Sequence, residues 1–314
     1  MNDYFIGIDL GGTRVKIGLT TSDNIVSSVV VPAQSGNGLA ASLPFITAEV
    51  NRLLQHNQIP ASALRGVGMG FPGLVDPYRK KILSTNAKYD DALAISLESW
   101  VTEQWNVPFF IDNDARMAAV GEWKFGAGKD NDNLVAMTIG TGIGTAAIVE
   151  GKLLRGKHFQ AGCLGGHFSV QYNGRACTCG NAGCMEAYAA TWSIRERIRE
   201  DIDYPGSSMY AAPVTDFELL FAAADDGDAL ALRLLQECLD IWAAGIVNLI
   251  HAYDPEVVVI GGGVMNNPDK VLPYITERVH RQAWCPWGKV ALRPTTLLSD
   301  AGILGVVYCL QHAV

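Results

Sequence analysis

Short apolar runs separated by glycine and polar turn residues dominate the N-terminal third of the chain. The segment YFIGIDLGGTRVKIGLTTSDNIVSSVVVP contains three such runs, with the turn signals GGT and SDN between them. This pattern predicts three strands joined as an antiparallel meander. The pattern then predicts helices over 39–57 and 97–105, a buried strand over 66–70 and a short strand at PFFID (108–112). Strands that alternate with helices are typical of an α/β architecture.

The order of elements begins again after residue 114. A helix is predicted over 115–124, and in the following segment, NLVAMTIGTGIGTAAIVEGKLL, two apolar runs flank a Gly/Thr turn. This segment echoes IGIDLGGTRVKIGL near the N-terminus, so we expect a duplicated lobe. We place an N-terminal α/β lobe at 1–113, with a C-terminal helix (301–314) packing back on it. A larger C-terminal lobe then covers 114–300.

Later segments complete the pattern, with helices predicted over 187–201, 216–225, 229–253 and 301–313. The capping-box pattern from Thr215 to Glu218 predicts the start of the second of these helices. VVVIGGGV predicts a strand that enters a glycine turn. The most apolar helix contains charged residues, and its large apolar residues step by three and four, which indicates one buried face and not a membrane span.

Composition narrows the class of partner. The 314 residues are enough for two lobes of about 150 residues each. Of these residues 49% are hydrophobic and 18% charged, as in a well-packed globular protein. The net charge of −8 argues against nucleic acid or an anionic membrane surface as the main partner. We therefore expect a small ligand, with no nucleic-acid or membrane partner.

The N-terminus and the cysteine count indicate the compartment. The first residues lack the basic region, the apolar stretch and the cleavage site of a signal peptide. The chain has seven cysteines, an odd number, and structural disulfides are rare in a reducing compartment. We therefore expect a cytoplasmic protein in which the lone cysteines are packing residues.

One glycine turn near the N-terminus could bind phosphate. Gly11, Gly12 and Thr13 follow Asp9 at the end of the first predicted strand. Glycines let backbone N–H groups approach a polyphosphate, Thr13 can add a hydroxyl donor, and Asp9 could hold Mg²⁺ through water. The Gly-Lys-Ser/Thr of a P-loop is missing from this turn, and an ordinary hairpin turn also explains its glycines.

A second Gly/Thr turn occupies the repeated position in the second lobe. It contains Thr138, Gly140, Thr141 and Gly142. Two matching turns are what a two-sided clamp on a triphosphate would require, so this pair favours a nucleotide ligand.

A third glycine run follows a later strand. Gly261, Gly262 and Gly263 could let an adenosine lie against the backbone, or could form an ordinary strand-to-helix turn. The run matches the dinucleotide-binding fingerprint poorly, so a Rossmann oxidoreductase is not favoured.

Asn113 and Asp114 lie where a predicted strand ends and a helix begins. Asparagine and aspartate are preferred helix caps, and capping alone would explain the dipeptide. A carboxylate at this point could also be a general base that takes the proton of a substrate hydroxyl as its oxygen attacks the γ-phosphate. Both interpretations stay open at this level.

A cysteine-rich segment, CTCGNAGC, predicts a metal site. Its three cysteines, Cys177, Cys179 and Cys184, follow His167 by ten residues or more. Three cysteines and one histidine form a common tetrahedral zinc set. A redox pair would more usually be Cys-x-x-Cys, and a disulfide would be out of place in a reducing compartment. Because no spare ligand is evident, we expect the zinc to be structural.

Taken in order, these motifs resemble the ROK family of bacterial sugar kinases and repressors. The resemblance rests on IGIDLGGT, GFPGLVD (70–76), NDARMAAVGEWKFGAG (113–128), TIGTGIGTA, the His/Cys set that ends in Glu186, and VVVIGGGV. It covers nearly the whole chain. It implies a two-lobed, duplicated actin-like and hexokinase-like fold of the ribonuclease H type, with ATP between the lobes. The implied reaction is phosphorylation of a hexose, most often glucose at the 6-hydroxyl.

The same resemblance implies roles for individual residues. Asp114 would be the catalytic base, and His167 would place one ring nitrogen on zinc and the other toward the sugar. The remaining sugar-binding residues would be Asn113 and Glu186, which bind hydroxyls, with Gly73 and Asn86 lining the same pocket. A homodimer or homotetramer is also implied.

The chain departs from the family at one sugar-binding position. The family loop usually reads Gly-Glu-x-Gly-His, and the position three residues before His167 is Leu164. Loss of a charge-assisted hydrogen bond to a sugar hydroxyl costs about 1.5–3 kcal/mol. The alternatives to a glucokinase are therefore a kinase for a sugar altered at C1 or C2, a rearranged loop, and a sugar-binding protein with weak or no kinase activity.

A DNA-binding regulator is the rival from another class. Such members of the family carry a helix-turn-helix before the first phosphate turn. The first predicted strand begins at Tyr4, so we expect no such domain in this chain.

Overall fold

The computed structural model describes residues 3–85 and 88–312. Contacts divide the chain into two compact units, which are described separately. Unit 1 consists of Met1–Asp132, Ala146–Cys163 and Thr296–Val314, and unit 2 of Asn133–Thr145 and Leu164–Thr295. Helix α3 (Asp114–Phe125) thus groups with unit 1. The lobe boundary near residue 113 stays a prediction.

Unit 1 is built on a five-stranded sheet with the order β3-β2-β1-β4-β7. Its strands are β1 (Tyr4–Leu10), β2 (Arg14–Thr20), β3 (Ile25–Pro32), β4 (Leu64–Phe71) and β7 (Phe109–Asn113). β1, β2 and β3 form the antiparallel meander that the sequence predicts, whereas β1, β4 and β7 run parallel. The carboxyl ends of these three parallel strands therefore meet at one edge of the sheet.

Glycines let the last helix, α9 (Ala301–Gln311), lie directly on this sheet. Gly7 pairs in register with Gly18 on one side and with Gly68 on the other. A Cβ atom built at Gly7 would lie 2.9 Å from the carbonyl oxygen of Ile303, and one at Gly68 would lie 2.9 Å from Cγ2 of Val306. Side chains at these positions would push the helix away from the strands.

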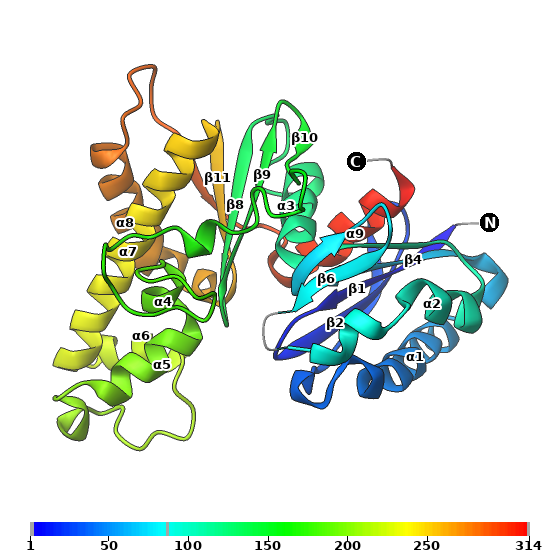
Figure 1. Ribbon diagram of the computed structural model, residues 1–314, viewed down its shortest axis with the longest axis horizontal. Helices are drawn as coiled ribbons and strands as arrows, with labels where there is room; N and C mark the ends of the chain where they lie inside the picture. The colour runs from blue at the N-terminus through cyan, green and yellow to red at the C-terminus, as the bar shows by residue number, and fades with distance from the viewer. Residues whose placement is uncertain (1–2, 86–87, 313–314) are drawn as a thin grey trace. The chain divides into compact units, whose positions relative to one another are not determined.

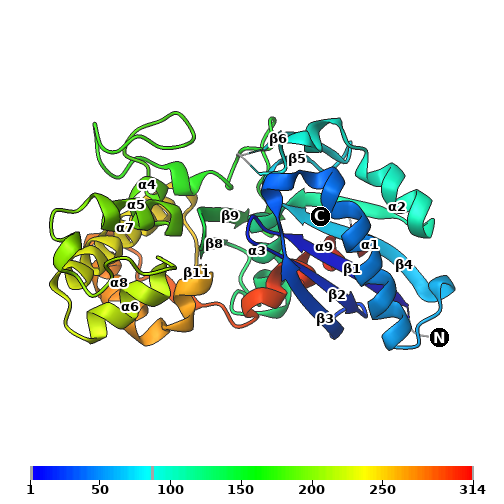
Figure 2. The same ribbon diagram turned by 90° about the horizontal axis from the view of Figure 1, so that it is seen from below.

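The two faces of the sheet are covered by different helices. Residues of β1 that alternate with the glycines, such as Ile6 and Ile8, form the core with Ile46 and Val50 of α1 (Leu39–His56). The shorter helix α2 (Leu97–Trp105) adds to this core. α3 packs against α9 on the other face. Figures 1 and 2 show α1 and α9 on opposite sides of the sheet.

Unit 1 also contains a hairpin that the sequence analysis missed. Strands β5 (Gly73–Asp76) and β6 (Lys81–Thr85) pair antiparallel outside the main sheet. The turn between them is held by Asp76, whose Oδ1 accepts hydrogen bonds from the N–H groups of Tyr78 and Arg79. The strands are short and β6 is largely exposed, so the apolar alternation that identifies a strand is absent.

A second sheet repeats the strand order of the first. Its order is β10-β9-β8-β11-β12, formed by β8 (Leu134–Ile139), β9 (Ile143–Val149), β10 (Lys152–Leu153), β11 (Val257–Gly261) and β12 (Ala291–Pro294). In both sheets the strand that comes first in the chain is central. The next two strands lie successively on one side of it, and the last two lie successively on the other side. β8, β11 and β12 are parallel, like β1, β4 and β7. The predicted duplicated α/β fold is confirmed by this repeated topology.

Helices fill the rest of unit 2. They are α4 (Glu186–Ala189), α5 (Thr191–Glu200), α6 (Phe217–Asp225), α7 (Ala229–Tyr253) and α8 (Pro268–Gln282). α7 packs against α6 and α8, and the buried Trp242 of α7 donates from Nε1 to the carbonyl of Ala189 over 2.9 Å. Across the described residues, no helix combines the length and the apolar character needed to cross a bilayer.

Two local predictions in unit 2 are wrong. The single helix expected over 187–201 is broken at Ala190, which is extended (φ −102°, ψ 164°). The break frees the N–H groups of Thr191 and Trp192 to bond a glycine turn of another segment, a contact that local sequence does not reveal. The cap of α6 is Asp216, which accepts from the N–H of Leu219, and not the expected Thr215.

Candidate active site and metal centre

Three sequence-predicted site residues meet at the carboxyl edge of the first sheet. Asp9 lies near the end of β1 and pairs in register with Gly70 of β4, and Gly70 pairs with Asp112 of β7, next to Asn113. Ligands of α/β proteins bind at the carboxyl ends of parallel strands. The sheet order thus places Asp9, Asn113 and Asp114 in the region where a ligand is expected.

The first glycine turn is held through its carbonyl groups. The carbonyl of Gly11 accepts from the hydroxyl of Tyr89 at 3.0 Å, and that of Gly12 accepts from Oγ of Ser35 at 2.7 Å. The carbonyl of Thr13 accepts from the N–H of Ala33 at 3.0 Å. With these oxygens engaged by the protein, the turn has a fixed shape before any ligand binds.

Asp9 and Asp114 both lie next to Gly70 in unit 1. A Cβ atom built at Gly70 would lie 3.6 Å from Oδ1 of Asp9 and 3.4 Å from Cα of Asp114. Burial, reinforced by the charge of Asp114, raises the pKa of Asp9 to about 7, although Lys16 acts in the opposite direction. Neighbouring carboxylates that burial disfavours as anions are a donor set that a divalent cation stabilises. Asp9 therefore fits the Mg²⁺ site that the sequence suggested.

Asn113 and Asp114 share the start of α3, and their two possible roles are compatible. Asn113 is the cap, since its Oδ1 accepts from the N–H of Arg116 at 3.1 Å. Its Nδ2 donates to Oδ1 of Asp114 at 3.0 Å and to the carbonyl of Gly73 at 3.1 Å. Oδ1 of Asp114 also accepts from the N–H of Ala115 at 2.8 Å. The cap therefore fixes the carboxylate that follows it.

Burial makes Asp114 a better base than an ordinary aspartate. Desolvation raises the pKa of Asp114 to about 6, against the charge of Lys88 and the hydrogen bonds from Ala115 and Asn113. A base is most effective when its pKa lies near the working pH. Gly73, for which the resemblance implies a place in the sugar pocket, accepts a hydrogen bond from Asn113 at this corner through its carbonyl group. Asn86, the other residue implied to line that pocket, lies outside the described residues.

A buried ion network behind this corner was missed by the sequence analysis. Asp112 and Arg116 are fully buried, and the carboxylate of Asp112 contacts the guanidinium groups of Arg116 (3.3 Å) and Arg155 (2.8 Å). Nη2 of Arg116 also donates to the carbonyls of Phe159 and Ala161 at 2.9 and 3.0 Å. The network ties α3 to the segment 155–161. The available signal was an arginine set among the apolar residues Ala115, Met117, Ala118 and Ala119.

The second glycine turn lies in unit 2 and is held by the start of helix α5. The carbonyls of Gly140 and Thr141 accept from the N–H groups of Thr191 and Trp192 at the start of α5. Within the turn, Gly140 N–H donates to the carbonyl of Gly142 at 2.9 Å. Like the first turn, it is fixed through its carbonyl oxygens. Thr138 lies near the end of β8, just before the turn, and its Oγ1 is 3.4 Å from the carbonyl oxygen of Gly144.

The side chain of Glu186 is hydrogen-bonded to the segment that forms this second turn. Its Oε2 accepts from the N–H of Ile143 at 2.7 Å, and its Oε1 accepts from Nε1 of Trp192 at 3.2 Å. A Cβ atom built at Gly142 would lie 2.6 Å from Oε2, so the carboxylate packs directly against the turn. Glu186 is 6% exposed. Its carboxylate joins the cysteine-rich segment to the second glycine turn. Its role in binding sugar hydroxyls stays a prediction.

The third glycine run lies beside the second turn. Gly261 pairs with Thr138 at the ends of β11 and β8. Gly262 has φ +89°, and a Cβ atom there would lie 2.1 Å from the carbonyl of Ile139. Only glycine permits both this conformation and this approach. Gly263 then begins a short 3₁₀ helix, Gly263–Asn266.

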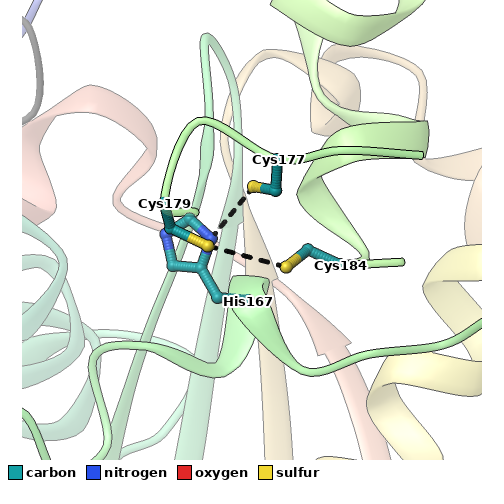
Figure 3. Close-up of side chains that lie close together, drawn as sticks. All are labelled: His167, Cys177, Cys179 and Cys184. Atoms are coloured by element: carbon teal, nitrogen blue, oxygen red, sulfur yellow. Dashed lines mark hydrogen bonds between the residues drawn. The ribbon is translucent and has the colours of Figure 1, made fainter. Parts of the chain in front are cut away.

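His167, Cys177, Cys179 and Cys184 converge as the sequence predicts. Their potential ligand atoms all lie within 4.8 Å of one another (Figure 3). Sγ of Cys179 and Cys184 are 3.7 Å apart, and Nδ1 of His167 is 3.5 Å from Sγ of Cys177. Tetrahedral zinc with Zn–S of about 2.3 Å would separate two sulfurs by about 3.8 Å. The donor set and its spacing therefore fit zinc, with Nδ1 as the histidine ligand.

Only a small apolar core surrounds this cluster. Its hydrophobic core consists of Cys177, Cys184 and Ala187, with Tyr188 and Trp192 against them. Gly183 has φ +74°, and a Cβ atom there would lie 1.8 Å from the carbonyl of Gln171. So small a core cannot by itself order a loop of this length, and structural zinc supplies folding free energy in such segments.

The repeated sheet order defines a duplicated α/β protein, in which each unit carries a carbonyl-anchored glycine turn and unit 2 carries the His/Cys cluster. The ROK family model matches residues 5–313, and the chain belongs to the ROK family.

Similar proteins of the family include kinases and regulators. The chain is 31% identical to a glucokinase from Thermotoga maritima over 98% of both chains. It is 29% identical to the xylose repressor of Bacillus subtilis, over 96% of this chain and 76% of the repressor. A crystal structure of a ROK family glucokinase from Streptomyces griseus, in complex with glucose and AMPPNP, has a TM-score of 0.82 at 27% identity. That match covers 97% of this chain and 98% of the other.

Replacing one ligand tests the metal centre. We expect purified wild-type protein to contain about one zinc per chain and Cys179→Ser to contain much less, with a thermal midpoint lower by several degrees. Elemental analysis and thermal unfolding measure the two quantities. Cys285→Ser is the matched control, because Cys285 is also partly accessible but lies outside the cluster. Equal metal content and stability in the three proteins would contradict a zinc site.

Proposed function

We propose that the protein is an ATP-dependent sugar kinase that phosphorylates a hexose, glucose or a related sugar, at its 6-hydroxyl. The observation that carries the proposal is Asp114, a carboxylate fixed by Asn113 at the start of α3, with a pKa raised to about 6 by burial. Similarity to glucokinases and to a ROK glucokinase bound to glucose and AMPPNP supports it.

In the proposed reaction Asp114 acts on the sugar hydroxyl. Its carboxylate accepts the proton of the 6-hydroxyl while the hydroxyl oxygen forms a bond to the γ-phosphorus of ATP. The bond from that phosphorus to the β–γ bridging oxygen breaks, and ADP leaves with the electron pair. Positioning and charge stabilisation supply most of the catalysis in phosphoryl transfer. The hydrogen bonds from Asn113 and Ala115 hold the carboxylate of Asp114 in position.

Phosphates and adenosine are assigned to the three glycine segments. Gly11, Gly12 and Thr13 bind phosphate oxygens in unit 1. In unit 2 the phosphate ligands are Thr138, Gly140, Thr141 and Gly142, and Gly261, Gly262 and Gly263 support the adenosine. Asp9 would hold Mg²⁺, whose chemistry is to neutralise the phosphate charge.

The sugar is assigned to residues around Asp114 and the metal segment. Asn113, Gly73 and Asn86 contribute from unit 1, and His167 and Glu186 from unit 2. With Nδ1 directed to the cysteines, Nε2 of His167 is the nitrogen available to a hydroxyl. Zinc, when bound, would fix this ring and the loop that ends in Glu186. The proposal also includes a cytoplasmic location and a homodimeric or homotetrameric assembly.

A catalytically silent sugar-binding protein is the second candidate. It is favoured by similarity to the xylose repressor of Bacillus subtilis and by Leu164 in place of the family's glutamate. Leu164 is a partly exposed apolar residue in unit 2, so it gives a sugar hydroxyl no acceptor from its side chain.

A sugar panel separates the two candidates. Purified protein is mixed with Mg-ATP and glucose, mannose, fructose, 2-deoxyglucose, N-acetylmannosamine or xylose, and ADP release is followed in a coupled assay. We expect ADP from at least one hexose, and a 10²–10⁴-fold lower kcat for Asp114→Asn, which keeps the shape but removes the base. Sugar binding by calorimetry with no ADP from any sugar would favour the silent candidate. Full activity in Asp114→Asn would reject the base.

The pH dependence of kcat/KM follows from the direction of the shift. Asp114 must be ionised to accept a proton, and burial raises its pKa to about 6. Activity is therefore expected to be constant above this pH and to fall about tenfold per unit below it. An unshifted aspartate would place the acidic limb near pH 4. Initial rates at low sugar concentration between pH 5 and 9 measure the limb, and rates that stay constant down to pH 5 would contradict the shift.

The substitution Leu164→Glu tests the sugar class. A restored carboxylate is expected to raise kcat/KM for glucose by about tenfold or more, since a charge-assisted hydrogen bond contributes about 1.5–3 kcal/mol. Sugars that lack the hydroxyl concerned should not gain. Leu164→Gln is the control for a polar side chain without charge. Equal changes for glucose and 2-deoxyglucose would show that position 164 does not contact the C2 hydroxyl.

A further inference from the structure

Lys88 lies across the first glycine turn. A Cβ atom built at Gly12 would lie 2.5 Å from Cε, 2.7 Å from Cδ and 3.1 Å from Nζ of Lys88. The end of the lysine side chain therefore occupies the space that any side chain at position 12 would need. The sequence pattern suggested phosphate binding for Gly12 and indicated no role for Lys88.

The neighbouring tyrosine fixes the position of Lys88. Tyr89 is fully buried and has φ +57°, a conformation that a bulky residue adopts only when its surroundings enforce it. Its hydroxyl donates to the carbonyl of Gly11 at 3.0 Å, and its N–H donates to the carbonyl of Ser35 at 3.1 Å. Ser35 in turn donates from Oγ to the carbonyl of Gly12 at 2.7 Å. Lys88 is thus anchored to the turn through the residue that follows it.

The charge of Lys88 is not used by the fold. In the part of the chain that the structure describes, Lys88 has no ion pair and no hydrogen bond from its ammonium group. Lys16 and Lys80, in contrast, pair with Asp300 and Glu98. Lys88 is partly buried, and its charge lowers the pKa of Asp114 against the effect of burial. The ammonium group is therefore close enough to act on both the glycine turn and the proposed base.

We propose that Lys88 is a further catalytic residue, whose ammonium group contacts the γ-phosphoryl group of ATP during its transfer. This inference rests on the proposed kinase function. The ammonium group offers three hydrogen-bond donors and no acceptor, which suits the oxygens of a phosphoryl group. A fixed cation that faces the transferred group stabilises the charge on its oxygens as the bond to ADP breaks.

The position also argues against two other roles for Lys88. A residue that served only to hold Asp114 ionised would not need to lie over Gly12, where the end of the Lys88 side chain fills the space next to the turn. A residue that only bound the sugar would change KM for the sugar and leave the interaction with the nucleotide intact. These roles therefore predict different kinetics.

The test compares Lys88→Met, Lys88→Arg and Lys81→Met with wild type. Methionine keeps the apolar stem and removes the charge, and arginine keeps the charge. Lys81 is the matched control, an exposed lysine of strand β6 in the same unit. We expect kcat to fall at least 10²-fold in Lys88→Met at saturating sugar, with sugar KM within threefold of wild type. Lys88→Arg should recover part of the loss, and Lys81→Met should match wild type.

Three results would overturn the inference. These are kcat within twofold of wild type in Lys88→Met, a raised sugar KM with unchanged kcat, and a loss of kcat that disappears at pH 9. The last would show that Lys88 acts only by lowering the pKa of Asp114. Circular dichroism and thermal unfolding confirm that each variant is folded.

Nucleotide binding separates a failure of this inference from a failure of the proposed function. If wild type phosphorylates no sugar, the kinase proposal fails, and Lys88 is then judged by calorimetry with Mg-ATP and Mg-ADP. Loss of the γ-phosphate contact should weaken Mg-ATP binding to Lys88→Met at least tenfold and leave Mg-ADP binding within twofold. Equal affinities of wild type and Lys88→Met for Mg-ATP would reject the contact with the γ-phosphoryl group.

Discussion

The site depends on carboxylates that are held where burial disfavours their negative charge. Asp112, Asp9 and Asp114 lie at the same edge of the first sheet, but their partners differ. Asp112 meets two guanidinium groups. Among the described residues, Asp9 and Asp114 pair with no arginine, and burial raises the pKa of both, although Lys16 acts against the shift at Asp9, and Lys88 and the hydrogen bonds from Asn113 and Ala115 act against it at Asp114. Carboxylates whose charge burial disfavours destabilise a fold unless a ligand or cation compensates them. Such a cost is characteristic of functional sites, where proteins give up stability for chemistry.

Close backbone approach is the second constraint, and glycine makes it possible. α9 lies on the sheet because Gly7, Gly18 and Gly68 stand side by side, and β8 meets the third glycine run because Gly262 lacks a side chain. The first and second glycine turns are both held by their carbonyl oxygens, the first by Tyr89 and Ser35 and the second by the start of α5. The two turns therefore have the same physical design although different segments support them.

In unit 2 the cysteine segment is hydrogen-bonded to the second glycine turn. Glu186 follows the last cysteine and bonds the second glycine turn through Ile143, so the cluster and the turn share one hydrogen-bond network. A ligand of the turn and a ligand of the loop would each influence the other through this carboxylate. This coupling is local, because it runs through one side chain and two segments that are in direct contact.

The sequence by itself determined the duplicated α/β fold, the approximate bounds of many helices and strands, the His/Cys cluster and the positions of the three glycine segments, but not helix α8 or strands β5, β6 and β12. These follow from apolar periodicity, glycine and ligand spacing, which are local properties of the chain. Only the tertiary structure decided the break at Ala190, the binding of Glu186 to the second turn, the buried network of Arg116 and the place of Lys88 over Gly12. Each of these depends on a partner that is distant in sequence, and the energy of burying a charge or bonding a carbonyl is set by that partner and not by the neighbours along the chain.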